Sequence, residues 1–358
     1  LKKAIDGKSV RKINLNRQIR EDARDPSKQH LFYETDVPIE TRVLIDKYGE
    51  SDEPSTGHRE LNFDIETEIL QGFPDWKNPI NKITAIAWHE KLTDQYGVLV
   101  LDEENKVKTS VEGNKTVISC QSEAELLHCF LEQYEQLEPH ILTGWNIEMF
   151  DIPYLVCRIK RVLGDAEANR LSPVGQINYR EMIDKWFIEG VALLDYMLLY
   201  KKFTMGERPS YRLDAIGKHE VNLGKIEYEG NLDDLFNSDI NKYIEYNLND
   251  VEIVKRLDEK LKFIDLAKAI CHKGHIPYQK IHITSAYLDG AILTHTHRLG
   301  IVTKNVTRGV TKDSKFTGAY VKVPEPGRYE WIYDLDLTSL YPSIIMSLNM
   351  SPETKIGK

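Results

Sequence analysis

The sequence has few cysteines, no long apolar run and no excess of basic residues, and each absence excludes a class of protein. The four cysteines include no C-x-x-C pair, so we expect neither a zinc site nor a disulfide framework, and a reducing, intracellular setting fits; they are Cys120, Cys129, Cys157 and Cys271. The best candidate for a membrane span, Val191 to Tyr200, is too short and contains Asp195. A net charge of -9 argues against a uniformly basic nucleic-acid coat protein, although it is compatible with a local basic groove.

The length and composition are those of an ordinary soluble globular protein. With 358 residues, of which 41% are hydrophobic and 29% charged, the chain can form two or three domains. Residues 1–29 are charged and lack a sustained apolar period, and a polar linker at 49–58 indicates a domain boundary. The chain begins with Leu1 rather than methionine, from which we expect a truncated or processed polypeptide.

Residues 60–67 are the stretch around which the rest of the chain is organised. They predict a strand, in which successive side chains point to opposite faces, so the apolar residues between Leu61 and Ile65 face a core. Asp64 and Glu66 then share the other face, where they repel one another unless a proton or a hard cation such as Mg²⁺ or Mn²⁺ lies between them. By itself the stretch is equally well interpreted as an amphipathic edge strand whose acids meet only water.

Strands and helices alternate after this stretch. The runs 83–89 and 96–101 predict two strands that continue it as a meander. Apolar residues at helical spacing behind a serine predict a helix over 122–137, and residues 141–145 resemble a short buried strand. We therefore expect an α/β layered fold.

A further carboxylate, Asp151, lies at the predicted start of a helix. Apolar residues recur at helical spacing from Ile152 to Leu163, and Pro153 lies where a first helical turn tolerates proline. An aspartate at this position most often caps the helix, whereas one that faces a metal ion is rarer.

Asp250 lies in a long helical pattern over 241–263. Tyr246 precedes it by four residues, so the two side chains share one face of the helix. Taken singly, Asp250 is interpreted as a surface acid and Tyr246 as a core aromatic with its hydroxyl at the rim.

Taken together, these residues carry a family resemblance. In order and separation they resemble the three exonuclease motifs of proofreading family B DNA polymerases, here Asp64-x-Glu66, Asn146-x-x-x-Phe150-Asp151 and Tyr246-x-x-x-Asp250. The similarity is closest to polymerases of T4-like bacteriophages and extends from around Asp36 to the end of the chain. It is carried further by Leu142 to Glu148, Leu194 to Phe203 and Asp336 to Ile345.

The resemblance implies a ribonuclease H-like exonuclease domain with a mixed sheet and a metal-dependent site. It assigns Asp64, Glu66, Asp151 and Asp250 to two divalent ions, Mg²⁺ or Mn²⁺, which can serve the attacking and leaving oxygens of phosphodiester hydrolysis together. Tyr246 places the chain in the tyrosine subclass and would orient the water, because a phenol with a pKa of about 10 is a poor base at neutral pH.

The resemblance also implies ligands for single-stranded DNA. These are Asn146, whose amide would contact the backbone, Phe150, whose ring would stack on a terminal base, and Thr67. An aromatic residue before a helix is nonetheless usually part of a core. Asp195 matches the family without being one of its metal ligands, and we interpret it as structural.

The C-terminal residues resemble the start of the polymerase palm. Residues 331–337 predict a strand that contains Asp336, which matches the first metal aspartate of the palm, and Tyr341 matches the residue that stacks under the incoming sugar. No Asp-Thr-Asp motif follows, and one aspartate cannot build a two-metal nucleotidyl-transfer site. We therefore expect an incomplete polymerase site, either because the polypeptide is truncated or because a second chain carries the remainder.

The predicted function is a 3′→5′ proofreading exonuclease for single-stranded or frayed DNA ends. The predicted segments are a partial N-terminal domain at 1–57, the exonuclease at 58–265, a return through the N-terminal domain and a linker at 266–325, and the beginning of the palm at 326–358. The alternatives are a non-catalytic DNA-binding or assembly half of a polymerase and an RNA-directed exonuclease of the same superfamily.

The expected partners follow from the same resemblance. They are single-stranded and primer-template DNA and, in the split-polymerase case, a second chain. A replication clamp is compatible with the family, although no motif for one is visible, and no membrane partner is expected. The expected location is the cytoplasm of a phage-infected bacterium.

Overall fold

A computed structural model describes residues 21–22, 25, 27–28, 31–51, 53, 55–69, 74–303, 318–351 and 354. Most of the charged N-terminal stretch discussed above lies outside these residues. The chain divides into two units, Leu1–Val306 and Thr307–Lys358, and each is described by itself. Of the helices that the structure describes, none combines the length and the apolar character that crossing a bilayer requires.

A mixed sheet forms the centre of the first unit, with seven strands in the order β4-β5-β3-β2-β1-β6-β9. The inner strand β1 (Glu60–Thr67) pairs antiparallel with β2 (Ile83–Glu90) and parallel with β6 (Ile141–Gly144). β3 (Gln95–Leu101) runs antiparallel to β2, which confirms the predicted meander. Because β1 has a strand on each side, its interpretation as an edge strand is wrong.

Three strands that the sequence interpretation did not single out complete this sheet. β5 (Lys115–Cys120) pairs parallel with β3, and β4 (Ser110–Glu112) pairs antiparallel with β5. β9 (Ala192–Asp195) extends the other side, parallel to β6. A separate two-stranded hairpin consists of β7 (Ile177–Arg180) and β8 (Lys185–Ile188).

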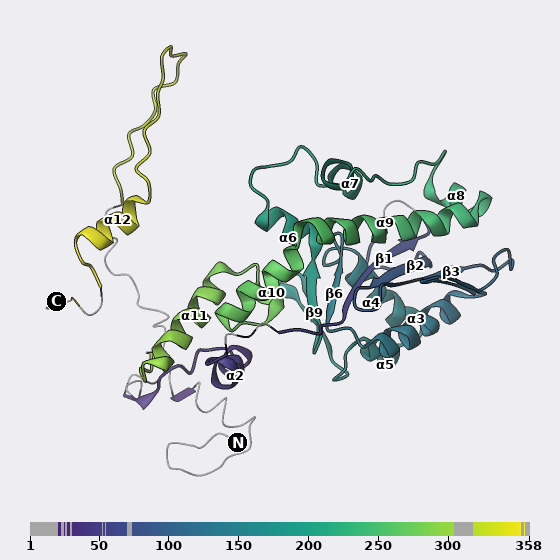
Figure 1. Cartoon of the computed structure of the whole chain (residues 1–358), viewed down its shortest axis with the longest axis horizontal. Helices are drawn as coiled ribbons and strands as arrows, with labels where there is room; N and C mark the ends of the chain where they lie inside the picture. The colour runs from purple at the N-terminus through teal and green to yellow at the C-terminus, as the bar shows by residue number, and fades with distance from the viewer. Residues whose placement is uncertain are drawn as a thin grey trace, which may run out of the picture. The chain divides into compact units, whose positions relative to one another are not determined.

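One face of the sheet is covered by α3 (Glu123–Leu137), α4 (Asp151–Val162) and the short α5 (Asp165–Ala168) (Figure 1). α3 begins as predicted, because the Ser122 side chain accepts a hydrogen bond from the backbone N–H of Glu125 at 3.2 Å. The apolar face of β1 lies in the same buried cluster as Phe130 of α3 and Leu155 of α4. The core face predicted for β1 is therefore confirmed.

The opposite face is crossed by the long helix α9 (Ile240–Leu261), which the sequence predicted over 241–263 (Figure 1). Small side chains of β2 and β3, such as Ala87 and Val98, pack against Tyr243 and Val251 of this helix. The α/β fold with a mixed sheet is confirmed, and β1 lies between two helical layers.

The structure describes further helices in the first unit. They are α2 (Ile39–Tyr48), α6 (Tyr196–Phe203), α7 (Leu213–Val221), α8 (Leu232–Ser238), α10 (Phe263–Gly274) and α11 (Thr284–Arg298), with 3-10 turns at Asn169–Leu171, Glu181–Ile183 and Tyr278–Lys280. Residues before and after the sheet region meet, since the Nε of Arg298 donates to the carbonyl of Gly49 at 2.9 Å.

In the second unit, residues 318–351 contain the helix α12 (Leu340–Ser347). The strand predicted over 331–337 is wrong, because no strand is present among the residues described there. A strand needs a partner for its backbone hydrogen bonds, and the side chains here are open to solvent, with Trp331 99% exposed. Asp336 and Tyr341 are exposed as well, and the predicted domain boundaries stay predictions.

Candidate active site

Three of the predicted metal ligands converge between β1 and α9. Asp64 and Glu66 extend from the face of β1 that lies under α9, and Asp250 comes from α9 itself. One carboxylate oxygen from each of the three lies within 4.8 Å of the others. Asp250 is buried and the two β1 acids are half-buried, so the three side chains are largely shielded from bulk water.

Asp151 approaches the same place from the other helical layer. It is the first residue of α4, and Phe150 occupies the N-cap position, so the interpretation of Asp151 as the helix cap is wrong. Its carboxylate instead accepts a hydrogen bond at 3.1 Å from the backbone N–H of Ile65, the residue between Asp64 and Glu66. Its charge raises the pKa of both β1 acids, which places it electrostatically within the cluster.

Lys225 also contacts the acid cluster, although a lone lysine in a sequence is most often solvated. It lies in the segment between α7 and α8, and its Nζ donates to the Oδ2 of Asp250 at 2.5 Å and to the Tyr246 hydroxyl at 3.0 Å. Its charge lowers the pKa of Asp64, Glu66, Asp151 and Asp250. No local pattern marks this lysine, because its contacts are 21 and 25 residues away in the sequence.

The cluster holds more negative charge than one lysine can balance. Burial and the neighbouring acids raise the pKa of Asp64 well above its usual range, and they raise that of Glu66 from 4.5 to about 8. Burial raises the pKa of Asp151 from 3.8 to about 7, against the hydrogen bond from Ile65. Burial also raises the pKa of Asp250 despite Lys225. In the absence of a cation Glu66 therefore retains its proton near neutral pH.

The donor set fits a hard divalent ion. The available ligand atoms are carboxylate oxygens, which Mg²⁺ and Mn²⁺ prefer. The Oδ1 atom of Asp250 is buried and has no hydrogen-bond partner among the described residues. A buried oxygen that lacks a hydrogen-bond partner and lies beside two other carboxylates is stabilised when it coordinates a cation.

Tyr246 is the predicted aromatic partner, and it lies at the edge of the acid cluster. Its side chain is 6% exposed, and the ring of Tyr228 packs edge-on against it at 5.4 Å. Burial and the charge of Asp250 raise the pKa of the phenol above its ordinary value, so Tyr246 stays protonated at neutral pH.

The loop that leads from β6 into α4 is held by Asp195. The Asp195 carboxylate accepts backbone N–H bonds from Asn146 at 3.2 Å and Glu148 at 3.1 Å, and it caps α6 by accepting from Leu198 at 3.2 Å. Gly144 precedes the loop, and a Cβ there would lie 2.5 Å from the carbonyl oxygen of Phe63. The three hydrogen bonds to its carboxylate support the structural interpretation of Asp195.

The predicted DNA ligands lie on or near this loop and β1. Asn146 is half-buried and has a φ of 68°, a left-handed conformation that asparagine tolerates better than most residues. Phe150 is half-buried and stacks on Tyr154 with the ring centres 5.6 Å apart. Thr67 is 6% exposed, so its side chain is largely covered. Their roles toward DNA stay predictions.

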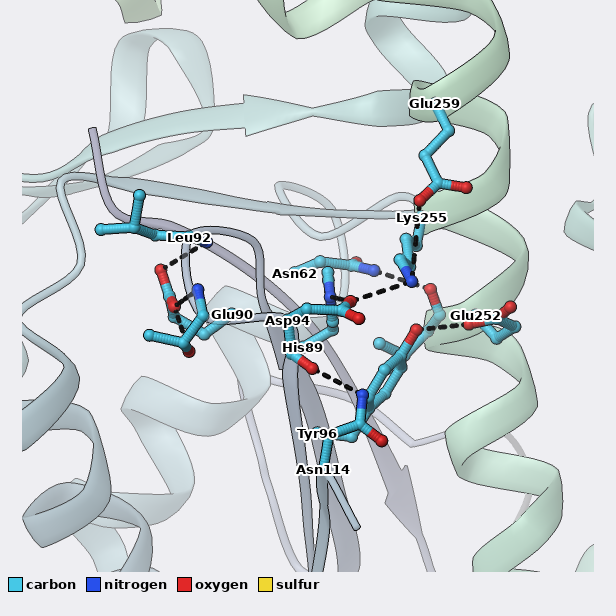
Figure 2. Close-up of polar contacts among 12 residues, drawn as sticks. Asn62, His89, Glu90, Leu92, Asp94, Tyr96, Asn114, Glu252, Lys255 and Glu259 are labelled. Carbon is cyan, nitrogen blue, oxygen red and sulfur yellow. Dashed lines mark hydrogen bonds and ion pairs between the residues drawn. The ribbon is translucent and has the colours of Figure 1, made fainter. Parts of the chain in front are cut away.

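α9 is fastened to the sheet by polar contacts beyond the acids (Figure 2). The Nδ2 of Asn62 donates to the carbonyl of Val251 at 2.8 Å. Toward the C-terminal end of the helix, Tyr96 donates to Glu252 at 2.5 Å, and Lys255 pairs with Asp94 at 2.9 Å. These contacts join α9 to β1 and to residues 94–96.

Comparison with known proteins identifies the family. Residues 8–216 match the exonuclease domain of DNA polymerase family B, and residues 282–358 match DNA polymerase family B. The chain belongs to family B of the DNA polymerases. The third motif of this family B chain, with Tyr246 and Asp250, lies between the two matched ranges, so its assignment depends on the geometry above.

Bacteriophage polymerases are among its relatives, which confirms the expected T4-like type. The chain is 36% identical over 330 residues to a DNA-directed DNA polymerase of Escherichia phage RB69 and 32% identical over 327 residues to that of Enterobacteria phage T4. Each alignment covers 84% of this chain and 36% of the relative. A DNA polymerase of Pyrococcus glycovorans is 26% identical over 356 residues, which covers 92% of this chain and 42% of that protein.

These matches bear on the fold and on the alternatives. The mixed sheet and the family agree with the expected ribonuclease H-like exonuclease fold. The relatives named above are DNA polymerases, so neither the RNA-directed exonuclease nor the non-catalytic assembly module is favoured. The chain spans about a third of the length of its phage relatives, whose activities therefore reach it only as proposals.

Proposed function

We propose that this chain contains a 3′→5′ exonuclease that hydrolyses the terminal phosphodiester of single-stranded or frayed DNA, as the proofreading part of a family B replicative polymerase. The observation that carries this proposal is the meeting of Asp64, Glu66 and Asp250 within 4.8 Å, with Asp151 bound to the backbone beside them. Separate elements on both faces of the sheet supply these acids. Unrelated surface acids would have no reason to converge in this way.

Asp64, Glu66, Asp151 and Asp250 would hold two divalent ions, Mg²⁺ or Mn²⁺. When bound, such ions stabilise the attacking and leaving oxygens of phosphodiester hydrolysis. The raised pKa values of the acids and the unpaired Oδ1 of Asp250 are the features of the chain that favour this occupancy.

Tyr246 and Lys225 would position the attacking water. Lys225 donates to the phenol oxygen, so the hydrogen of that phenol is left for another acceptor, which a water molecule can provide. Because its pKa is raised, Tyr246 orients this water and does not deprotonate it. Lys225 also holds Asp250 in place through its second hydrogen bond.

Asn146, Phe150 and Thr67 would contact the single-stranded end of the substrate. The Asp195 carboxylate fixes the backbone of Asn146, which sets the position of that amide next to the start of α4. Primer-template DNA is the proposed larger substrate, and a second chain, a replication clamp and a location in the host cytoplasm remain predictions.

The test is hydrolysis of an end-labelled primer with a 3′ mismatch, with Mg²⁺ and with a chelator. We expect metal-dependent shortening from the 3′ end by the parent chain and none by an Asp64→Ala, Glu66→Ala variant. Equal shortening by the two proteins would refute the assignment of these acids. A matched RNA oligonucleotide tests the RNA-directed alternative, and binding without any hydrolysis would favour the non-catalytic one.

A further inference from the structure

Asn247 contacts the acid cluster, although the third motif, Tyr246-x-x-x-Asp250, leaves its position unspecified. It follows Tyr246 in α9 and is 0% exposed. Its Nδ2 donates to the Oδ2 of Asp64 at 2.8 Å, across 183 residues of sequence. The amide therefore touches one of the proposed metal ligands directly.

We propose that Asn247 is a positioning residue for the metal site, an inference that rests on the proposed exonuclease function. Its amide fixes one oxygen of Asp64 and so sets the direction in which the other oxygen points. Groups that hydrogen-bond to a metal ligand orient that ligand and tune its affinity for the metal. Asn247 differs from Lys225 because a neutral donor orients a carboxylate without bringing a positive charge that repels a cation.

The other end of the Asn247 side chain supports this assignment. Its Oδ1 is buried and has no hydrogen-bond partner among the described residues, which is unfavourable for folding. An ionised carboxylate, the form that binds a cation, can only accept hydrogen bonds, so the donor end of the amide must face Asp64. The benefit of an amide at this position therefore lies at its Nδ2 end.

Asn62 provides a matched control within the same interface. It is also buried, at 5% exposed, and its Nδ2 also donates across β1 and α9 at 2.8 Å. Its Oδ1 is likewise buried without a partner among the described residues. Its acceptor, however, is the backbone carbonyl of Val251, so Asn62 joins the two elements without contacting a metal ligand.

The experiment measures Mn²⁺ affinity by electron paramagnetic resonance on the full chain, for the parent, Asn247→Ala and Asn62→Ala. Loss of a group that orients a ligand weakens metal binding about ten-fold or more, so we expect that loss for Asn247→Ala. Asn62→Ala should stay within about two-fold of the parent, because it shares no contact with the ligands. The nuclease activity of Asn247→Ala should recover at high Mn²⁺, which a general folding defect would not permit.

Asn247→Leu serves as a second variant if the alanine protein does not fold, since leucine keeps a branched side chain but has no donor. Unchanged Mn²⁺ affinity in the folded Asn247 variant, or equal losses of affinity in the two alanine variants, would overturn the positioning role. The metal site itself would still stand if the parent bound Mn²⁺ and Asp64→Ala weakened that binding. If the parent itself bound no Mn²⁺, or bound it as tightly after Asp64→Ala, both the exonuclease proposal and this inference would fail.

Discussion

Two aspartates in the two units of this chain show what packing adds to a sequence motif. Asp250 is 2% exposed, pairs with Lys225, and lies within 4.8 Å of two further acids. Asp336 is exposed and forms no hydrogen bond or ion pair with the residues that the structure describes. Both residues were predicted as metal ligands from their resemblance to family motifs. The difference shows that a motif identifies a candidate ligand, whereas a site requires several segments to pack around it.

The largest expected effect is a difference between variants of these two aspartates in the rate of 3′ hydrolysis. Asp250→Asn removes a ligand from the proposed metal site, and the loss of several kcal/mol of metal stabilisation corresponds to about a thousand-fold lower rate of 3′ hydrolysis. Asp336→Asn should leave that rate unchanged. Single-turnover hydrolysis of a labelled primer measures both, and similar losses in the two variants would break the comparison.

A smaller loss of hydrolysis rate is expected when the hydroxyl of Tyr246, in the first unit, is removed. Tyr246→Phe should slow hydrolysis about a hundred-fold, because a misplaced nucleophile costs roughly that factor. Tyr243→Phe is the control, since this buried tyrosine lies one helical turn earlier and its hydroxyl forms a 2.6 Å hydrogen bond with the hydroxyl of Thr84. A Tyr243→Phe protein that lost as much activity as Tyr246→Phe would show that the hydroxyl acts through folding.

Substitution of Asp195 tests whether this buried acid, which lies outside the metal cluster, affects DNA binding by holding the loop between β6 and α4. Asp195→Asn replaces one of the two carboxylate oxygens that accept backbone N–H groups with an NH₂ group that cannot accept them. We expect KM for single-stranded DNA to rise about ten-fold, the equivalent of one lost hydrogen bond to a charged group, with Mn²⁺ affinity unchanged. A loss of Mn²⁺ affinity with no change in KM would contradict the assigned role.

The smallest effect concerns stability and pH. The pKa of Glu66 rises from 4.5 to about 8 on folding, so between these values the folded chain binds more protons than the unfolded chain. When a chelator keeps the site free of metal, the stability that the protonated Glu66 contributes is therefore lost as the pH rises through about 8. We expect Tm of the parent to fall by a few degrees relative to Glu66→Gln between pH 5 and pH 8, and Mg²⁺ to reverse this fall. Parallel Tm curves for the two proteins would contradict the raised pKa.

The sequence predicted those parts of the structure that depend on local periodicity. The alternation in β1 and the helical spacing in α3, α4 and α9 each give an element close to its observed bounds. The strand predicted around Asp336 fails because a strand needs a partner, which alternation alone cannot supply.

The polar partners of the acids could not be predicted in the same way. Lys225 and Asn247 reach the site through contacts between residues that are distant in sequence, and the spaced motifs specify neither of them. Asp195 was correctly interpreted as structural, but its hydrogen bonds to the loop that contains Asn146 follow only from the packing of β9 beside β6.

The proposed exonuclease requires that acids from β1, α4 and α9 hold a pair of divalent cations. Anomalous diffraction from crystals soaked in Mn²⁺ tests it most directly, because it locates the ions and their ligands without reference to activity. We expect two anomalous peaks bounded by Asp64, Glu66, Asp151 and Asp250. Crystals of the Mn²⁺-soaked protein with no peak among these four carboxylates would contradict it.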